Sequence, residues 1–590
     1  MIIQALTKRY ETLLANGKLD KPGWSREKVS FALSIDSEGN LKDLIDLRNE
    51  KTIGKKQVLE PVLMSVPTPV GKTSGYAASY MYDGIKYLLG IDKDGITKRS
   101  RESFETSRKH HLELLSDCQG SAAKAVYAFF NKWNPSMYMS IPHYAEYQSE
   151  LSKNPSAVFW LEHEYAQDDL EVRESWDRVY QNNTNPVKME CLDTGKVEPI
   201  VRLHPNIKNV RGHGAQTMGA KLVSYNDEAF NSYGHTQGEN APTSEYAAFA
   251  YGVALNELLS DKNHAHALGD TTVVSWAEDS TEGYCDLFDA MLFRNNQNST
   301  VSDTELTSLI SKIVHGDEVN WGNIPINPEN PFHILGLSPN AGRIAVRFYL
   351  TDSFRDISRK ILNHYDRLKV KTPSTYMGVK YSLQSLLFET VNQKLSDKTA
   401  SPELEGEMLR SILTDTQYPA LLFNEVQLRI RAERVITPGR AAIIKAYLLK
   451  NPVSTMNDQY KEALTVELNE DCNYIPYLLG RAFSLMEGIQ EIANPDINAT
   501  IKDKYFTSAS ATPDIIFPIL INLSQKHIKK IKGKNTGLAV VMERSLNGIL
   551  ARITSDYPKH LSLHDQGIFQ LGYYHQREKR FEKKEALDNE

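Results

Sequence analysis

The stretch "GRIAVRFYL" (residues 342–350) lies just before the point where the pattern of this chain changes. Its apolar residues alternate with polar ones, which is the period of a β-strand. Past "KVKTPS" (369–374) the apolar residues instead recur every three or four positions, as they do in helices. The predicted fold is therefore an α+β region with a mixed or antiparallel sheet at residues 1–370, followed by an all-α helical bundle at residues 371–575.

Upstream of that stretch, strand and helix signals are mixed. Alternation from Val29 to Ile35, a turn at "DSEGN" and the segment "LKDLIDLR" predict a pair of antiparallel strands. Residues 101–180 are predicted to be mostly helical, as an insertion into this region. Strand-like pieces return in "AKLVSY" and "TTVVSW", interleaved with the helix "SEYAAFAYGVALNELL". The strands and helices do not alternate regularly, which argues against a doubly wound parallel sheet.

Downstream, the bundle is predicted from segments with helical spacing that are separated by proline and glycine. These segments are 402–414, 419–434, 440–450, 476–493, 514–532 and 536–553. The last stretch, residues 576–590, balances acidic and basic residues and is predicted to be a frayed, charged tail.

Composition narrows the class of protein. The chain has 590 residues, 41% of them hydrophobic and 24% charged, which is ordinary for a folded protein of two or more domains. The apolar runs are too short to cross a bilayer, and the N-terminus is predicted to be an amphipathic helix without a secretion signal. The four cysteines lie far apart, so we expect a reducing cytoplasm and no membrane partner. A net charge of −6 leaves room for local basic patches.

Two motifs resemble catalytic signatures but are incomplete. Gly71-Lys72-Thr73-Ser74 ends like a phosphate-binding loop, but Val66 stands where that loop needs its first glycine. His163-Glu164 begins like a zinc-protease helix, but Gln167 stands where the second histidine ligand belongs. A nucleotide-hydrolysing loop and a zinc-protease site are therefore not expected.

Other candidates are no stronger. "RGHGAQTMGA" lacks dinucleotide-binding spacing, and the pairs His110/His111 and His264/His266 have no carboxylate cluster of metal-ligand type near them in the sequence. A serine–histidine–aspartate triad stays open, since its members can lie far apart, but no GxSxG turn anchors one. We therefore expect no catalytic residue, no metal and no cofactor, and we expect that the protein is not an enzyme.

Cations gather in two runs within the predicted bundle. The first run contains Arg429, Arg431, Arg434 and Arg440, and the second contains Lys526, Lys529, Lys530 and Lys532. On a helix, Lys526, Lys529 and Lys530 share one side, while Ile528 and Ile531 face the core. One such run alone is more often a solvated helix face. Two runs in one helical domain favour a basic surface that faces phosphates.

The strand "GRIAVRFYL" offers a further cationic face. Strand alternation predicts that Arg343, Arg347 and Tyr349 point one way, and that Ile344, Val346, Phe348 and Leu350 point the other. Cations beside an aromatic ring suit phosphate contact and base stacking, as on sheets that bind single strands. An exposed, inert sheet face is an equal alternative.

The most distinctive block is "LVSYNDEAFNSYGHTQGENAPTSEYAAFAYGVALNELL", where a glycine-rich loop precedes a helix. Gln237 and Asn240 lie in this loop, and amide side chains both donate and accept hydrogen bonds, so they could read base edges. Turn-forming residues with no partner are the alternative interpretation, and the residues alone slightly favour it.

This block belongs to a longer series of motifs that identify a family. The series includes "CLDTG" (191–195), "AKLVSYNDEAFNSYGHTQGENAPTSEYAAFAY", "LGDTTVVSWAE", "LGLSPNAGRIAVRFY", "RAAIIKAYLL", "NATIKDKYFTSASATP" and "LGYYHQR" (571–577). Together they resemble the large subunit of the subtype I-C CRISPR surveillance complex, often called Cascade. The resemblance runs from "KPGWSREKVSFALSID" to Arg577, nearly the whole chain.

The resemblance implies a non-catalytic subunit that joins the CRISPR RNA-bound backbone and end-capping subunits. Such a subunit recognises a flanking motif (the PAM) in double-stranded target DNA, assists unwinding and R-loop formation, and supports recruitment of a separate helicase-nuclease. The resemblance also implies that the helical bundle resembles the small subunit, which is made from an internal start of the same gene. Met456 and Met486 are plausible starts by position.

With this resemblance, the loops and cations receive hypothetical roles. We expect Lys72, Thr73, Ser74 and Gly75 to contact the duplex, with Gly75 allowing close approach. We expect Gln237 and Asn240 to read bases or separate strands, and the basic helices to hold the displaced strand. The alternatives are a nucleic-acid-processing enzyme such as a nuclease, and an unrelated protein-binding adaptor.

Overall fold

The computed structural model describes most of the chain as two compact units. The described residues are 1–53, 56–70, 76–182, 185–212, 214–293, 303–373, 382–392, 394, 400–453 and 458–588. Unit 1 comprises Met1–Asn206 and Val223–Leu255, and unit 2 comprises Ile207–Leu222 and Asn256–Glu590. In the ranges just given, no helix combines the length and the apolar character that spanning a bilayer requires.

Unit 1 is built around a mixed sheet with strand order β3-β2-β8-β7, to which β9 adds by pairing with β8. The strands are β2 (Phe31–Ile35), β3 (Leu41–Asp46), β7 (Tyr82–Gly84), β8 (Ser156–Leu161) and β9 (Glu164–Tyr165). The predicted return strand is confirmed as β3, which pairs antiparallel with β2. On its other side β2 pairs in parallel with β8, and successive residues of β2 are buried because the strand is central.

Helices cover this sheet. They are α2 (Ile85–Leu88), α3 (Lys98–Leu115), α4 (Ser121–Lys132), α5 (Tyr144–Leu151) and α6 (Leu170–Asn182), with 3-10 turns η1 (Pro135–Ser140) and η2 (Ala166–Asp168). The first helix, α1 (Ile2–Ala15), packs elsewhere in unit 1, where Tyr10 lies edge-on to Tyr246 and Phe249. Residues 101–180 are mostly helical, as predicted, but they also supply β8, so this segment helps to form the sheet. His111 is buried and stacks on Phe130 with 4.4 Å between ring centres, which makes it a core residue.

Shorter elements complete unit 1. Three pairs of strands lie outside the main sheet: β1 (Trp24–Val29) with β6 (Val62–Pro67), β4 (Asn49–Ile53) with β5 (Lys56–Glu60), and β10 (Lys188–Glu190) with β11 (Val197–Pro199). The 3-10 turns η3 (Glu228–Phe230) and η4 (Gln237–Asn240) precede α7 (Glu245–Ser260). The helix predicted from "SEYAAFAYGVALNELL" is confirmed as α7.

Unit 2 begins with a larger mixed sheet, in the order β12-β13-β19-β18-β15-β14. Its strands are β12 (Asn206–Ile207), β13 (Ala220–Lys221), β14 (Ala265–Leu268), β15 (Thr271–Ala277), β18 (Pro331–Asn340) and β19 (Arg343–Ser353). Beside it lie the hairpin β16 (Val319–Trp321) and β17 (Ile324–Ile326), and helices α8 (Gly283–Leu292), α9 (Asp303–His315) and α10 (Phe354–Leu368). Buried residues of these strands and helices belong to one hydrophobic core.

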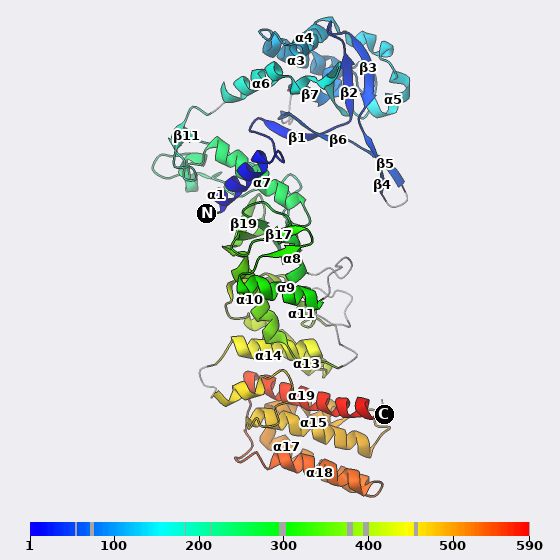
Figure 1. The fold of residues 1–590 in the computed structure, drawn as a ribbon, viewed down its shortest axis with the longest axis vertical. Helices are drawn as coiled ribbons and strands as arrows, with labels where there is room; N and C mark the ends of the chain where they lie inside the picture. The colour runs from blue at the N-terminus through cyan, green and yellow to red at the C-terminus, as the bar shows by residue number, and fades with distance from the viewer. Residues whose placement is uncertain are drawn as a thin grey trace. The chain divides into compact units, whose positions relative to one another are not determined.

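The remainder of unit 2 is helical, which confirms the predicted fold class. Its elements are α11 (Leu383–Phe388), α12 (Pro402–Thr414), α13 (Ala420–Glu433), α14 (Pro438–Lys450), η6 (Asp458–Ala463), α15 (Ile475–Ala493), α16 (Ile501–Ala511), α17 (Pro513–Lys532), α18 (Thr536–Leu550) and α19 (Leu563–Asp588). Helices α15, α17, α18 and α19 lie side by side (Figure 1). Where α15 meets α19, a Cβ atom on Gly480 would lie 1.9 Å from the carbonyl oxygen of Phe569, so this close approach requires glycine.

The sequence predicts two domain boundaries in the second half of the chain, at residue 370 and at residue 576. Residue 370 follows α10, whose buried residues share one hydrophobic core with the helices beyond it, so a domain boundary there stays a prediction. The segment expected to be a frayed tail lies on α19 as far as Asp588, and its fraying stays a prediction. Its first residues contact α15, because the Arg580 guanidinium donates to the Ser484 carbonyl (2.6 Å) and pairs with Glu491 (2.6 Å).

Candidate nucleic-acid interface

The first predicted contact loop cannot be placed. Lys72, Thr73, Ser74 and Gly75 lie outside the described residues, between β6 and Tyr76. Their contact with duplex DNA stays a prediction.

The second loop, residues 231–243 of unit 1, is held by its own polar groups. Gly238 is buried, and a Cβ atom there would lie 2.0 Å from the Val201 carbonyl oxygen, so only glycine fits. The Asn240 side chain accepts from the Ser232 backbone N–H (2.9 Å) and donates to the Gln237 carbonyl (3.0 Å). The amide of Asn240 therefore fixes the loop, while its contact with bases stays a prediction.

Gln237 lies at the surface beside residues that sequence reasoning missed. Its Oε1 accepts a hydrogen bond from Nη1 of the exposed Arg202 at 3.0 Å. Tyr233, in the left-handed conformation with φ of 53°, has a side chain that is 97% exposed. The sequence could have indicated Tyr233, because an aromatic residue in a glycine-rich turn is often exposed. It could not have indicated Arg202, because Arg202 lies 35 residues from its partner Gln237. An arginine and a half-buried amide are thus paired at this loop, and an exposed aromatic ring lies four residues before the amide in the chain.

On β19 the predicted alternation is wrong because the strand contains a bulge. Gly336 pairs with Phe348 and Leu337 pairs with Val346, so Arg347 is an extra residue. Side chains before and after the bulge therefore change faces: Phe348 is buried in the core, whereas Val346 is 42% exposed. A single face made of Ile344, Val346, Phe348 and Leu350 does not form.

The two arginines of β19 differ in their surroundings. Nη2 of Arg347 lies 2.7 Å from Asp270 Oδ2 and donates to Ser338 Oγ at 3.3 Å, with half of the side chain exposed. Arg343 is half-buried and also interacts with other groups of the protein. Tyr349 is engaged as well, since its hydroxyl lies 3.0 Å from Nδ1 of His333. As a nucleic-acid contact, this face stays a prediction.

We name Arg429, Arg431, Arg434 and Arg440 the α13–α14 run. Arg440 is 1% exposed and donates to Glu433 (2.6 Å), to the Val435 carbonyl (2.9 Å) and to the Glu389 carbonyl (3.3 Å). Its guanidinium is thus held inside the helical region and away from solvent. The Arg440 side chain therefore links α13, α14 and the segment after α11 by hydrogen bonds.

The other members of the α13–α14 run also have partners. Arg429 lies 3.7 Å from Glu433, Arg431 donates to Gln566 on α19 (2.8 Å), and Arg434 lies 3.9 Å from Asp503 on α16. Arg431 and Arg434 are exposed at the surface. Only this exposed pair could reach a phosphate without breaking the helical core.

We name Lys526, Lys529, Lys530 and Lys532 the α17 run. All of them are exposed, whereas Ile528 and Ile531 are buried, which confirms the predicted orientation of the helix. Lys530 donates to the Asn494 side chain at 2.7 Å. Within the part of the chain that the structure describes, none of the lysines in this run pairs with a carboxylate. The α17 run is therefore a surface whose positive charge is not neutralised by ion pairs with the residues that the structure describes.

The two runs border the same connection in unit 2. Arg434 approaches Asp503 in the first turn of α16, and Lys530 holds Asn494 at the end of α15. The segment between Asn494 and Asp503 therefore lies between exposed cations from both runs. This proximity could not be read from sequence positions about 100 residues apart.

The surroundings of His264 and His266 differ from those predicted from the sequence. Side-chain ligand atoms of Asp261, His264 and Glu282 all lie within 4.8 Å of one another, and His266 Nε2 lies 2.6 Å from Asp289 Oδ1. The expectation that no carboxylate cluster of metal-ligand type accompanies this pair is therefore wrong. The acids come from the loop before β14 and from α8, which the fold brings against the strand.

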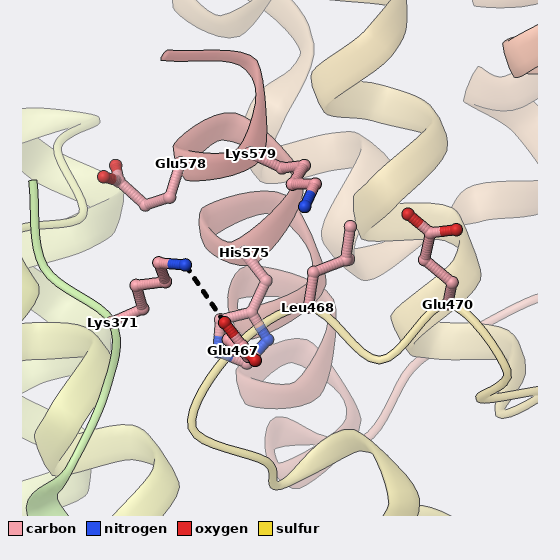
Figure 2. A pocket seen from close by; sticks show the side chains of 7 residues that line it. All are labelled: Lys371, Glu467, Leu468, Glu470, His575, Glu578 and Lys579. Atoms are coloured by element: carbon pink, nitrogen blue, oxygen red, sulfur yellow. Dashed lines mark hydrogen bonds and ion pairs between the residues drawn. The ribbon is translucent and has the colours of Figure 1, made fainter. Parts of the chain in front are cut away.

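A small pocket beside α19 is lined by charges of both signs (Figure 2). It has a volume of about 100 Å³ and is lined by Lys371, Glu467, Leu468, Glu470, His575, Glu578 and Lys579. Lys371 pairs with Glu467 at 3.1 Å. Burial lowers the pKa of His575 to about 4, so its ring is neutral near pH 7. Mixed charge and small volume do not suit a nucleic-acid groove.

The structure thus defines a protein of two units, each with a mixed sheet. Unit 2 adds a long helical region, and exposed lysines lie at the end of α17. Comparison with protein families matches residues 6–581 to the family described as CRISPR-associated protein (Cas_Csd1). The chain therefore belongs to this family, which confirms the resemblance to a CRISPR-associated protein. A search of curated proteins finds no match.

Proposed function

We propose that this chain is the large subunit of a subtype I-C RNA-guided surveillance complex, and that it is not catalytic. In this role it joins the CRISPR RNA-bound subunits and binds double-stranded target DNA. It recognises the flanking motif, assists unwinding and R-loop formation, and supports recruitment of a separate helicase-nuclease. The family match over residues 6–581 is the observation that carries the proposal.

The α17 run supports a role in holding nucleic acid. Its lysines are exposed and unpaired with carboxylates among the described residues, so a polyanion can approach them without displacing an anionic partner. Neutralising phosphates releases counterions, which makes binding favourable and dependent on salt. We assign this surface to the displaced strand, since its phosphates need cations while its bases stay unpaired.

The loop with Arg202, Tyr233 and Gln237 supports a role at the duplex. Arg202 and Gln237 offer donors and an acceptor for groove edges, and the exposed Tyr233 ring can stack on a base. We assign recognition of the flanking motif to this loop together with Lys72, Thr73, Ser74 and Gly75.

Co-expression with the neighbouring operon products tests the assembly. We expect the chain to purify with a short RNA and with the backbone subunits, and the complex to bind duplex target when magnesium is chelated. A chain that purifies alone, without RNA or partners, would reject the proposal.

Alanine at Lys72, Arg202, Tyr233 or Gln237, one at a time, tests the loops. We expect weaker target binding and altered preference among flanking-motif variants. Lys124, an exposed residue of α4, is the control position. Unchanged affinity and preference in every loop variant would remove both loops from the proposed function.

A nuclease is the second candidate function, because Asp261, His264 and Glu282 gather in unit 2. Purified protein incubated with Mg²⁺ or Mn²⁺ and labelled DNA or RNA separates the two candidates. We expect no cleavage, and cleavage that disappears in Glu282→Gln would establish the nuclease instead.

A further inference from the structure

Two histidines and several acids meet where β14 approaches α8. His264 ends the turn that precedes β14 and His266 lies on the strand, and the two side chains contact Glu282 and Asp289. Glu282, Asp286 and Asp289 recur at helical spacing along the start and the body of α8. The His266 ring stacks on Phe293 with 4.6 Å between ring centres, which restricts its orientation.

The hydrogen bonds of His264 fix the direction of each ring nitrogen. His264 is 1% exposed, and its Nδ1 lies 2.8 Å from the Ser275 carbonyl oxygen, which can only accept, so Nδ1 carries a proton. Nε2 therefore points the other way, to 2.7 Å from Glu282 Oε2. In the neutral ring Nε2 is a lone pair facing a carboxylate, and that contact requires a proton or a cation between the two atoms.

Asp261 brings a second carboxylate to the same point. Its ligand atom lies within 4.8 Å of those of His264 and Glu282. One proton can satisfy a single pair of acceptors, whereas a metal ion can be shared by all of them.

The neighbouring pair differs, because its two members satisfy each other. His266 Nε2 and Asp289 Oδ1 are 2.6 Å apart, which is the separation of a charge-assisted hydrogen bond. This pair therefore needs no further ligand, in contrast to the three side chains that meet at His264.

We propose that Asp261, His264 and Glu282 bind a divalent transition-metal ion that prefers nitrogen and oxygen ligands, such as Zn²⁺ or Mn²⁺. An imidazole with two carboxylates is a ligand set for such ions, while Mg²⁺ favours oxygen alone. The Ser275 carbonyl acts as the outer partner that orients a ligating histidine. This site goes beyond the proposed function and does not depend on it.

The ion would join three separate parts of unit 2. Asp261 lies in the loop after α7, His264 precedes the edge strand β14, and Glu282 is the residue before the first turn of α8. Cross-linking them stabilises the edge of the sheet, because a metal that binds only the folded state raises its stability.

Metal binding by the full-length protein, with its affinity tag removed, tests the site. After chelation and dialysis, Zn²⁺ or Mn²⁺ is added, and bound metal is measured by elemental analysis and titration calorimetry. We expect about one ion per chain, and at least about tenfold weaker binding in Asp261→Asn and in Glu282→Gln. Both variants preserve side-chain shape, and Glu543→Gln on the exposed face of α18 is the matched control.

The outcomes are distinct. Wild-type protein that binds no more metal than the double variant D261N/E282Q would overturn the proposal and leave His264 as a protonated partner of Glu282. Loss of binding in E282Q with D261N unchanged would overturn the three-ligand assignment. Metal that raises the midpoint of thermal unfolding in wild type and in E543Q, but not in the ligand variants, is the expected second readout.

Discussion

The α13–α14 run and the α17 run look alike in the sequence and differ in the structure. Each concentrates cations with few acids nearby in the chain. In the α13–α14 run Arg440 is buried between Glu433 and Glu389, and its neighbours are paired. In the α17 run every lysine is exposed and none meets a carboxylate among the described residues.

The difference teaches that a basic run is defined by its distant partners. Glu389, Gln566 and Asp503 come from other helices, and they convert arginines into packing and clamping residues. Where no such partner arrives, the charge stays available for a ligand. Four predictions test this distinction, in order of decreasing effect.

Removing the buried guanidinium of Arg440 should cause the largest loss of stability. Arg440→Met leaves Glu389 without its cation and leaves Glu433 with only the more distant Arg429, so we expect the free energy of unfolding to fall by about 3–5 kcal/mol. Urea denaturation of the purified chain measures this loss. Lys529→Met, in the α17 run, should stay within about 0.5 kcal/mol, and equal losses would erase the distinction between the runs.

The buried Lys445 of α14 should make the free energy of unfolding depend on pH. Burial lowers its pKa from 10.5 to about 8, while its ammonium donates to the Arg367 and Lys369 carbonyls. Between these pH values the unfolded chain binds the additional proton, so the free energy of unfolding rises with pH, by about 3 kcal/mol across the window.

Denaturation of wild type and Lys445→Met between pH 8 and 10.5 checks this, because only the variant lacks that contribution. Lys526→Met is the matched exposed control and should keep the wild-type slope. A variant whose slope equals that of wild type would show that Lys445 is not desolvated.

Charge removal in the α17 run should alter binding and leave stability unchanged. Replacing Lys526, Lys529, Lys530 and Lys532 with glutamine should weaken DNA opening by the assembled complex. If each lysine contacts one phosphate, the slope of log K against log salt should fall by about 0.7 per lysine. Replacing the exposed Lys93, Lys98, Lys109 and Lys124 of unit 1 removes the same charge as a control. An unaltered slope would remove the α17 run from the interface.

The exposed pair Arg434–Asp503 should contribute least. The two groups are 3.9 Å apart and about half exposed, so a double-mutant cycle should give a coupling of less than about 1 kcal/mol. A larger coupling would mean that the exposed end of the α13–α14 run is as constrained as Arg440.

Much of the helical region could be predicted because helical spacing is a local signal. All the segments with that spacing became helices, and α12 matches its predicted range of 402–414. The bulge at Arg347 could not be predicted, since an extra residue in a strand is defined by its partner strand. For the same reason β8 was not recognised within a helical segment: it is a strand because β2 lies beside it.

The candidate site was less predictable than the fold. Sequence identified the exposed lysines of α17, because a cationic side opposite Ile528 and Ile531 is a periodic pattern. It could not distinguish Arg440 from them, since the carboxylate of Glu389 lies 51 positions away in the chain. Glu282 was missed in the same way, since it lies 18 positions from its partner His264.

The parallel pairing of β2 with β8 has a consequence for synthesis. About 120 residues separate these strands, so at 5–20 residues per second the ribosome needs roughly 6–25 s to deliver β8 after β2. Until then Phe31, Ala32 and Leu33 form an apolar strand with one uncovered edge, which is the kind of segment that associates with other nascent chains. Slower translation before β8 should therefore lower the yield of native protein and increase its dependence on chaperones.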